Sequence, residues 1–134
     1  MTPDPKNPVK NSTHILIVDD DRASGKSLAL LLAATGYDEI RTVRSAARAM
    51  AIAATFHPAI AFLGKAESDA SGQELALNLQ KNSKPHGIRL IALTDSAEHP
   101  SREETRAAGV ERYLSRPVTP ADLDRALRKL PVSS

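Results

Sequence analysis

The sequence contains no cysteine, which excludes thiolate catalysis, disulfide bonds and cysteine-ligated zinc or iron–sulfur centres. Its only aromatic residues besides histidine are Tyr37, Phe56, Phe62 and Tyr113, too few for a platform that stacks single-stranded nucleic acid. No apolar run approaches the roughly 18 residues that cross a bilayer, so we expect no membrane contact. Residues 1–12 contain proline and lysine but no apolar stretch. We therefore expect a flexible tail rather than a signal peptide, and a cytoplasmic protein.

A large excess of one charge is also missing. The chain has 18 basic and 16 acidic side chains, a net charge of +2. The first 80 residues hold 8 of the basic and 9 of the acidic side chains, which leaves 10 and 7 in the second part. This mild basic excess does not by itself indicate a nucleic-acid-binding protein.

Strand and helix patterns alternate along the remaining chain. Continuous apolar runs predict strands buried on both faces at residues 15–18 and 59–63, and further short strands are predicted at residues 40–43, 88–93 and 110–114. Helical spacing and start or stop residues predict helices at residues 24–34, 45–55, 72–80, about 100–108 and 119–130. Thr119, followed by Pro120 and by Asp122 at the third position, is a clear helix start, and Gly36 is a clear helix end. Five such alternations predict an α/β fold, a doubly wound five-stranded parallel sheet with helices on both faces, over residues 13–130 with a tail at 131–134.

Polar residues directly follow four of the predicted strands. They are Asp19-Asp20-Asp21, Gly64-Lys65, Thr94-Asp95 and Ser115-Arg116-Pro117. In doubly wound sheets, ligands bind at the carboxyl ends of the strands. Carboxylates, a hydroxyl and a cation at one edge suit a divalent cation of the Mg²⁺ type and a phosphoryl group.

Together these segments resemble the receiver domain of two-component response regulators. The resemblance spans about residues 13–130 and is carried by Ile15–Asp21, His57-Pro58, Ala92-Leu93-Thr94, Ala108-Gly109 and Tyr113–Pro117. It implies a flavodoxin-like fold and a non-enzymatic role in a phosphorelay. It also implies that Asp20 binds Mg²⁺ directly, that Asp19 does so mostly through water, and that Thr94 moves to the phosphoryl group on activation. Tyr113 would be the aromatic switch residue that follows Thr94, and Arg116 stands where the family has a lysine that contacts the phosphoryl group.

One departure from the family changes the expected chemistry. Gly64 stands at the position of the aspartate that is phosphorylated in the family, and the adjoining Lys65 and Ala66 supply no acid. Glycine can neither accept a phosphoryl group nor ligate a metal. We therefore expect no cofactor, or only weak Mg²⁺ binding at Asp19 and Asp20. We also hypothesise that Arg116 pairs with one of these two aspartates and holds one conformation without phosphate.

We thus predict an atypical single-domain response regulator that acts through phosphorylation-independent protein contacts. The resemblance places its partner surface at about residues 100–130, in the more basic half of the chain, with the cations Arg102, Arg106, Arg112, Arg125 and Arg128. The expected partners are a histidine kinase, another receiver, an output protein or a second copy of the chain, and sequestration of a kinase or phosphotransfer protein is a related role.

Alternatives stay open for the function and for single residues. The chain could be a ligand-binding or enzymatic flavodoxin-like domain, although its first strand-to-helix turn is acidic rather than glycine-rich. It could bind nucleic acid through its basic second part, although no helix-turn-helix is predicted. The aspartate triplet could be a solvated turn or a helix cap, Thr94 a turn cap, Tyr113 a core aromatic and Arg116 a structural ion-pair residue. The four histidines show no metal-ligand spacing and are expected at the surface or at strand edges.

Overall fold

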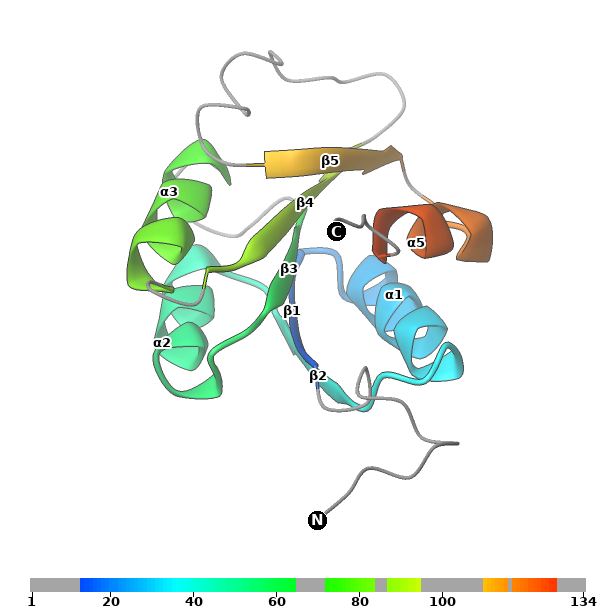
Figure 1. Cartoon of the computed structure of the whole chain (residues 1–134), viewed down its shortest axis with the longest axis horizontal. Coiled ribbons are helices and arrows are strands. Elements are labelled where there is room, and N and C mark those ends of the chain that lie inside the picture. The colour runs from blue at the N-terminus through cyan, green and yellow to red at the C-terminus, as the bar shows by residue number, and fades with distance from the viewer. Residues whose placement is uncertain (1–12, 65–71, 84–86, 95–109, 116, 128–134) are drawn as a thin grey trace.

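The computed structural model describes residues 13–64, 72–83, 87–94, 110–115 and 117–127. Within them, strands and helices alternate along the chain (Figure 1). The strands are β1 (His14–Val18), β2 (Glu39–Val43), β3 (Ile60–Leu63), β4 (Arg89–Thr94) and β5 (Val110–Ser115). The helices are α1 (Arg22–Ala34), α2 (Ala46–Phe56), α3 (Gly72–Asn82) and α5 (Pro120–Leu127). The helix predicted at about 100–108 and the two predicted tails lie outside the described residues.

All four strand pairings are parallel, and the strand order is β2-β1-β3-β4-β5. Helices α1 and α5 cover one face of the sheet, and α2 and α3 cover the other (Figure 1). The chain leaves β1 toward β2 on one side and returns to β3 on the other, so the order of the strands switches beside β1. These observations confirm the predicted doubly wound sheet and place its switch point at the ends of β1 and β3.

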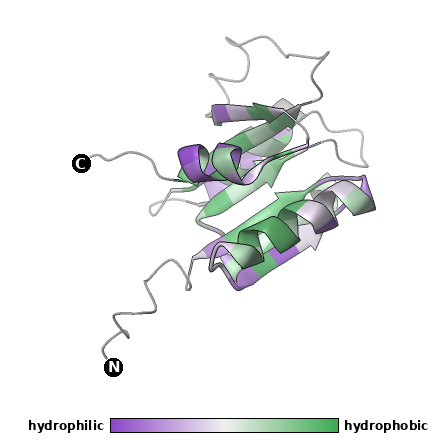
Figure 2. Ribbon diagram, turned by 90° about the vertical axis from the view of Figure 1, so that its right-hand side faces the viewer, coloured by the Kyte–Doolittle hydropathy of each residue, from purple (hydrophilic) through white to green (hydrophobic). Residues whose placement is uncertain are grey.

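The core lies on both faces of the sheet, which explains why residues 15–18 of β1 and the whole of β3 are continuously apolar. Residues 15–18 of β1 have no exposed surface. Alternate strand residues pack against the helices on the two sides, and the strands are largely apolar in Figure 2. Toward α1 and α5 the core includes Ile15, Ile17, Phe62, Ile91, Leu28 and Leu123, and toward α2 and α3 it includes Leu16, Val18, Leu63, Ala49, Leu75 and Leu79.

Two helix boundaries differ from the prediction by two residues. Helix α1 begins at Arg22 rather than at Ser24, because the Asp21 carboxylate accepts hydrogen bonds from the backbone N–H groups of Ala23 and Ser24 at 3.0 and 3.3 Å. Helix α3 continues to Asn82 rather than ending at residue 80. The polar residues Lys81 and Asn82 are exposed in its last turn and do not interrupt the helix. Several strand ends also differ from the prediction by one residue.

The predicted end of α1 is confirmed. Gly36 has φ of 110° and donates its N–H to the Ala33 carbonyl at 3.1 Å, while the Tyr37 N–H reaches the Leu32 carbonyl at 3.2 Å. This pair of bonds is a Schellman motif, in which glycine adopts the left-handed conformation without a steric penalty. The turn directs the chain back into edge strand β2.

The predicted start of α5 is confirmed as well. The Thr119 hydroxyl accepts a hydrogen bond from the Asp122 N–H at 3.1 Å, and the Asp122 carboxylate accepts one from the Thr119 N–H at 3.2 Å. This reciprocal pair is a capping box. The bond from the Thr119 backbone is the main reason that the pKa of Asp122 lies below its ordinary value of 3.8.

This capping box predicts a pH dependence of stability. Because folding lowers the pKa of Asp122, its stabilising effect is complete above about pH 4 and is lost as the pH falls through the lowered pKa. Asp122→Ala should therefore lower the urea midpoint near neutral pH, and the difference from wild type should shrink below about pH 4. Asp124→Ala removes an exposed acid of the same helix and is the matched control, because it leaves the cap intact. An equal difference at neutral and acidic pH would contradict this role of Asp122.

Candidate functional site

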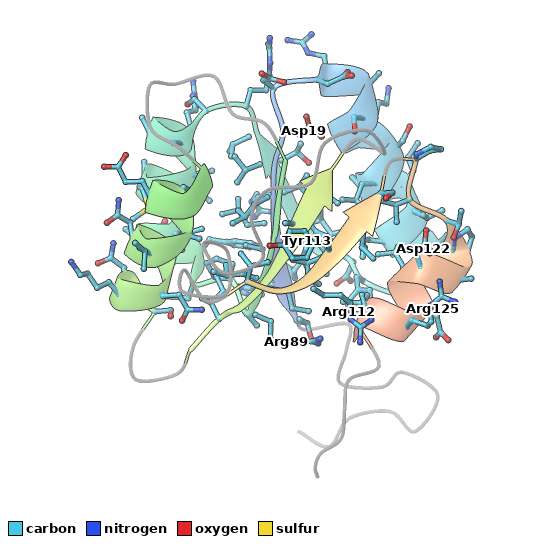
Figure 3. All side chains as sticks on the ribbon, turned by 90° about the horizontal axis from the view of Figure 1, so that it is seen from above. Asp19, Arg89, Arg112, Tyr113, Asp122 and Arg125 are labelled. Atoms are coloured by element: carbon cyan, nitrogen blue, oxygen red, sulfur yellow. The ribbon has the colours of Figure 1, made fainter. Side chains whose placement is uncertain are left out.

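Asp19 is a fully buried acid at the carboxyl end of β1. It has no exposed surface, although aspartate is almost never fully buried without partners. Its backbone N–H donates to the Val43 carbonyl at 3.0 Å, and its Oδ1 accepts from the Asp21 N–H at 3.0 Å. Figure 3 shows Asp19 near the start of α1, on the side toward which β4 and β5 point. The predicted acidic turn therefore lies at the strand edge where doubly wound sheets bind ligands.

Gly64 lies directly beside this carboxylate. It follows β3, and its N–H donates to the Val18 carbonyl at 2.7 Å. A Cβ atom placed on Gly64 would lie 3.1 Å from both Cγ and Oδ2 of Asp19 and 3.3 Å from the Val18 carbonyl oxygen. The φ of Gly64 is not positive, so its backbone alone would accept another residue. The close approach of Asp19 is what suits glycine here.

The other predicted site residues are described to different extents. Asp20 is half-buried next to Asp19. The backbone of Thr94 ends β4 opposite Ser115 of β5, so its strand end belongs to the same edge of the sheet. The Thr94 side chain and the whole of Arg116 lie outside the described part of the chain.

Tyr113 belongs to β5 and pairs in register with Ala92 of β4. The residue is half-buried, and its hydroxyl oxygen is shielded from solvent (Figure 3). A shielded hydroxyl is compatible with both roles proposed for Tyr113, the switch residue and the core aromatic.

The predicted partner surface is only partly described. Arg112 and Arg125 are exposed, whereas Arg102, Arg106 and Arg128 lie outside the described residues. Arg125 pairs with Asp122 at 2.8 Å between Nη2 and Oδ1, and such exposed pairs contribute little to stability. Helix α5 also contains Asp124, so its described surface carries both charges rather than a uniformly basic one.

Arg89 is an important residue that the sequence did not reveal. From the start of β4, its guanidinium donates to the carbonyl oxygens of Ala126 at 2.5 Å and Leu127 at 3.5 Å. These are carbonyls of the last turn of α5, where a cation is favoured by unpaired acceptors and by the helix dipole. Arg89 therefore fixes the C-terminal end of α5 to the sheet. It also acts on buried Tyr37, whose pKa is raised by burial while the positive charge of Arg89 opposes the rise.

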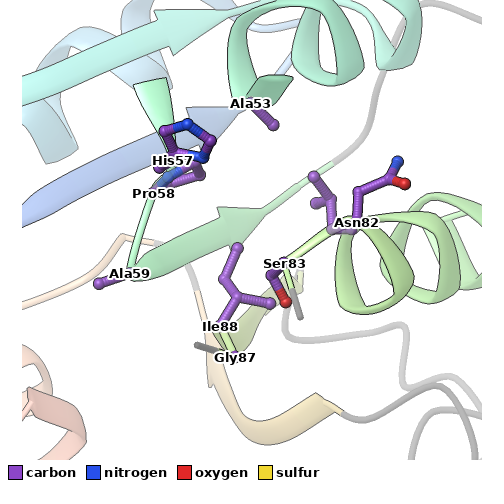
Figure 4. A pocket seen from close by; sticks show the side chains of 9 residues that line it. Ala53, His57, Pro58, Ala59, Asn82, Ser83, Gly87 and Ile88 are labelled. Atoms are coloured by element: carbon purple, nitrogen blue, oxygen red, sulfur yellow. The ribbon is translucent and has the colours of Figure 1, made fainter. Parts of the chain in front are cut away.

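The amino-terminal end of the sheet has separate features. A cavity of about 200 Å³ lies between the ends of α2 and α3, and Figure 4 shows His57, Asn82, Ser83 and Ile88 among its lining residues. His57 is exposed and adopts the left-handed conformation at the end of α2, with φ of 52°.

Nearby, His14 is not a simple surface residue. It is half-buried, it stacks on Phe56 with ring centroids 4.5 Å apart, and its Nδ1 lies 2.6 Å from the Phe56 carbonyl oxygen. The Arg41 guanidinium lies 4.8 Å from the centre of the same ring. His86 and His99 lie outside the described residues.

The Mg²⁺ ion that a receiver fold implies has a reduced site among the described residues, in which Asp20 remains partly accessible while Asp19 is fully buried. Mg²⁺ requires an octahedral set of oxygen ligands, including protein carboxylates. In the part of the chain that the structure describes, no group of three or more His, Cys, Asp or Glu side chains is arranged to hold a metal ion. One Asp19 oxygen already accepts the Asp21 N–H, and Gly64 has no side chain to contribute.

A parallel sheet of this order, with polar residues at the carboxyl ends of its strands, defines a flavodoxin-like domain. The model of the response regulator receiver domain family matches residues 15–128. The chain belongs to this family and is a receiver domain of two-component signalling. This assignment confirms the resemblance seen in the sequence. None of the described helices is long and apolar enough to span a bilayer.

Relatives and solved structures agree with this assignment. The polar-differentiation response regulator DivK of Brucella ovis is 31% identical over 105 residues, which cover 78% of this chain and 85% of the relative. A CheY-like receiver domain from Methanospirillum hungatei JF-1 is 30% identical, with a TM-score of 0.71 over 84% of this chain and 88% of that one. The signal receiver domain of a modulated diguanylate cyclase from Desulfovibrio desulfuricans G20 is 25% identical, with a TM-score of 0.74 over 85% and 89%.

Proposed function

We propose that this receiver domain signals through protein contacts without phosphorylation of an aspartate at the end of β3. The observation that carries the proposal is Gly64, which follows β3 at the strand edge and has no side chain. Phosphoryl transfer to a receiver requires an oxygen nucleophile that the phosphodonor can reach. The neighbouring Asp19 carboxylate is fully buried, so it does not replace the missing acceptor.

The proposed output is binding, and its surface includes β5 and α5. The exposed Arg112 and Arg125 lie there together with Asp122 (Figure 3), and α5 also contains the acid Asp124. A surface with both charges selects partners by electrostatic complementarity more than by net attraction. The proposed partners are a histidine kinase, another receiver, an output protein or a second copy of this chain, all in the cytoplasm. Holding a kinase or phosphotransfer protein in an unproductive complex is one form of this function.

The test is phosphorylation with a small-molecule donor. The purified chain is incubated with acetyl phosphate and Mg²⁺, and its intact mass is measured before and after hydroxylamine, which cleaves acyl phosphates. A receiver domain that has the acceptor aspartate is treated in parallel as the control. We expect no phosphoryl adduct on this chain, and a hydroxylamine-sensitive adduct would overturn the proposal.

A binding titration tests whether the domain binds a partner independently of phosphorylation. Affinity for a purified histidine kinase from the same organism is measured with and without acetyl phosphate. We expect the same dissociation constant in both conditions and weaker binding for Arg112→Glu. A dissociation constant that changes with the phosphodonor would contradict phosphorylation-independent binding.

A further inference from the structure

The Asp19 carboxylate occupies the space into which a side chain at residue 64 would extend. We infer that this carboxylate closes the space beside Gly64, so that Asp19 itself does not ligate a divalent cation and Gly64→Asp alone does not restore a phosphoryl acceptor. The inference rests on the proposed function, in which Gly64 leaves the domain without an acceptor. It adds that the domain lacks more than an acceptor side chain at residue 64, because the Asp19 carboxylate occupies the space that such a side chain would need.

The first step of the argument is steric. A Cβ atom on Gly64 would approach Cγ and Oδ2 of Asp19 to 3.1 Å, closer than carbon atoms normally approach such neighbours. The backbone of Gly64 does not require glycine, because its φ is not in the left-handed region. At such a position, changing glycine to alanine normally stabilises a protein. Here the nearby Asp19 carboxylate should make the change from glycine to alanine destabilising.

The second step is that Asp19 has little freedom to move away. Its N–H is bonded to the Val43 carbonyl at 3.0 Å, and its Oδ1 accepts the Asp21 N–H at 3.0 Å. Asp21 in turn caps α1 through its own carboxylate. On the other side, a Cβ atom on Gly25 of α1 would lie 3.9 Å from the Asp19 Cβ, so the helix packs closely behind this residue. A displacement of Asp19 would disturb the ends of β1 and β2 and the start of α1 together.

The third step concerns metal ligands. A cation at this edge needs carboxylate oxygens that remain accessible to it and to its water ligands. Asp19 has no exposed surface, one of its oxygens is engaged with Asp21, and the other faces residue 64. An aspartate introduced at residue 64 would have to extend past this buried carboxylate. The steric argument therefore opposes a simple reversal.

The experiment compares Gly64→Ala in three backgrounds. In the wild-type background it should lower the urea midpoint. In the Asp19→Asn background, where the side chain keeps its shape but loses its charge, it should lower the midpoint by a similar amount. In the Asp19→Ala background, where Cγ and both oxygens are absent, it should lower the midpoint less or raise it. A rise in the wild-type background, or an equal loss beside Asp19→Ala, would overturn the inference, and the first of these outcomes does not require the Asp19 variants to fold.

Phosphorylation of Gly64→Asp separates this inference from the proposed function. We expect no hydroxylamine-sensitive adduct on Gly64→Asp after treatment with acetyl phosphate and Mg²⁺. An adduct on Gly64→Asp but not on the wild type would overturn the inference and leave the proposed function intact. An adduct on the wild type would overturn the proposed function itself.

Discussion

Phe62→Ala should lower the free energy of unfolding by about 3–5 kcal/mol, the largest single effect that we predict. Among the residues that the structure describes, Phe62 is the largest fully buried side chain, and it lies in β3, at the centre of the sheet. Its ring packs in the core between the sheet and helices α1 and α5. Alanine would leave a cavity in this core in addition to the lost burial of the ring, and both effects reduce stability.

Equilibrium unfolding in urea, followed by far-UV circular dichroism, measures this loss. Phe62→Leu is the matched control, because leucine fills part of the same space and should cost less than alanine. The slope of the unfolding transition should stay constant, which shows that both variants unfold from the same compact state. A loss below about 1 kcal/mol for alanine would contradict the close packing around Phe62, because it would mean that the core collapses into the space.

Arg89→Met should lower the free energy of unfolding by about 1.5–3 kcal/mol. Methionine retains much of the aliphatic side chain but removes the guanidinium that donates to the Ala126 and Leu127 carbonyls. Hydrogen bonds from a charged donor are stronger than neutral ones, and these two carbonyls are at the end of α5. The same change should weaken partner binding, because α5 is part of the proposed partner surface.

Hydrogen exchange locates the effect within the fold. In Arg89→Met the amides of α5 should exchange faster than in wild type, while the amides of β1 and β3 should change only in proportion to the global loss of stability. Arg89→Lys retains the charge without the planar pair of donors, and it should give an intermediate stability. Uniform acceleration over all elements would show that Arg89 supports the sheet in general rather than the end of α5.

The alternation of strands and helices could be predicted because its causes are local. Strands buried on both faces must be continuously apolar, as residues 15–18 are, and a glycine or a capping residue marks a helix end. The boundary errors are also local. Asp21 stands in an acidic triplet after a strand, a position that fits both an acidic site and a helix cap, and the polar Lys81 and Asn82 resemble a loop in the sequence although they lie in the last turn of α3.

The position of the candidate site could be predicted from the sequence, but the close approach of its residues could not. The rule that parallel strands bring their carboxyl ends to one edge was enough to place Asp19 and Gly64 near each other. The register that pairs Val18 with Leu63, and the bond from the Gly64 N–H to the Val18 carbonyl, decide the approach of 3.1 Å between a Cβ at residue 64 and the Asp19 carboxylate. No pattern in the sequence encodes such a distance, because it depends on how two strands and one helix pack together.

The sequence by itself determined the class of fold, the receiver resemblance and the absence of a side chain at residue 64, because these follow from residue identity and periodicity. Only the tertiary structure decided that Asp19 is buried against Gly64 and that Arg89 holds the end of α5. The two hydrogen bonds of Arg89 join residues that are separated by 37 and 38 positions in the sequence. The contact of Asp19 with Gly64 joins two neighbouring strands. Such contacts are settled by packing and strand register, whereas local propensity and hydrophobic pattern act only on residues near one another in the chain.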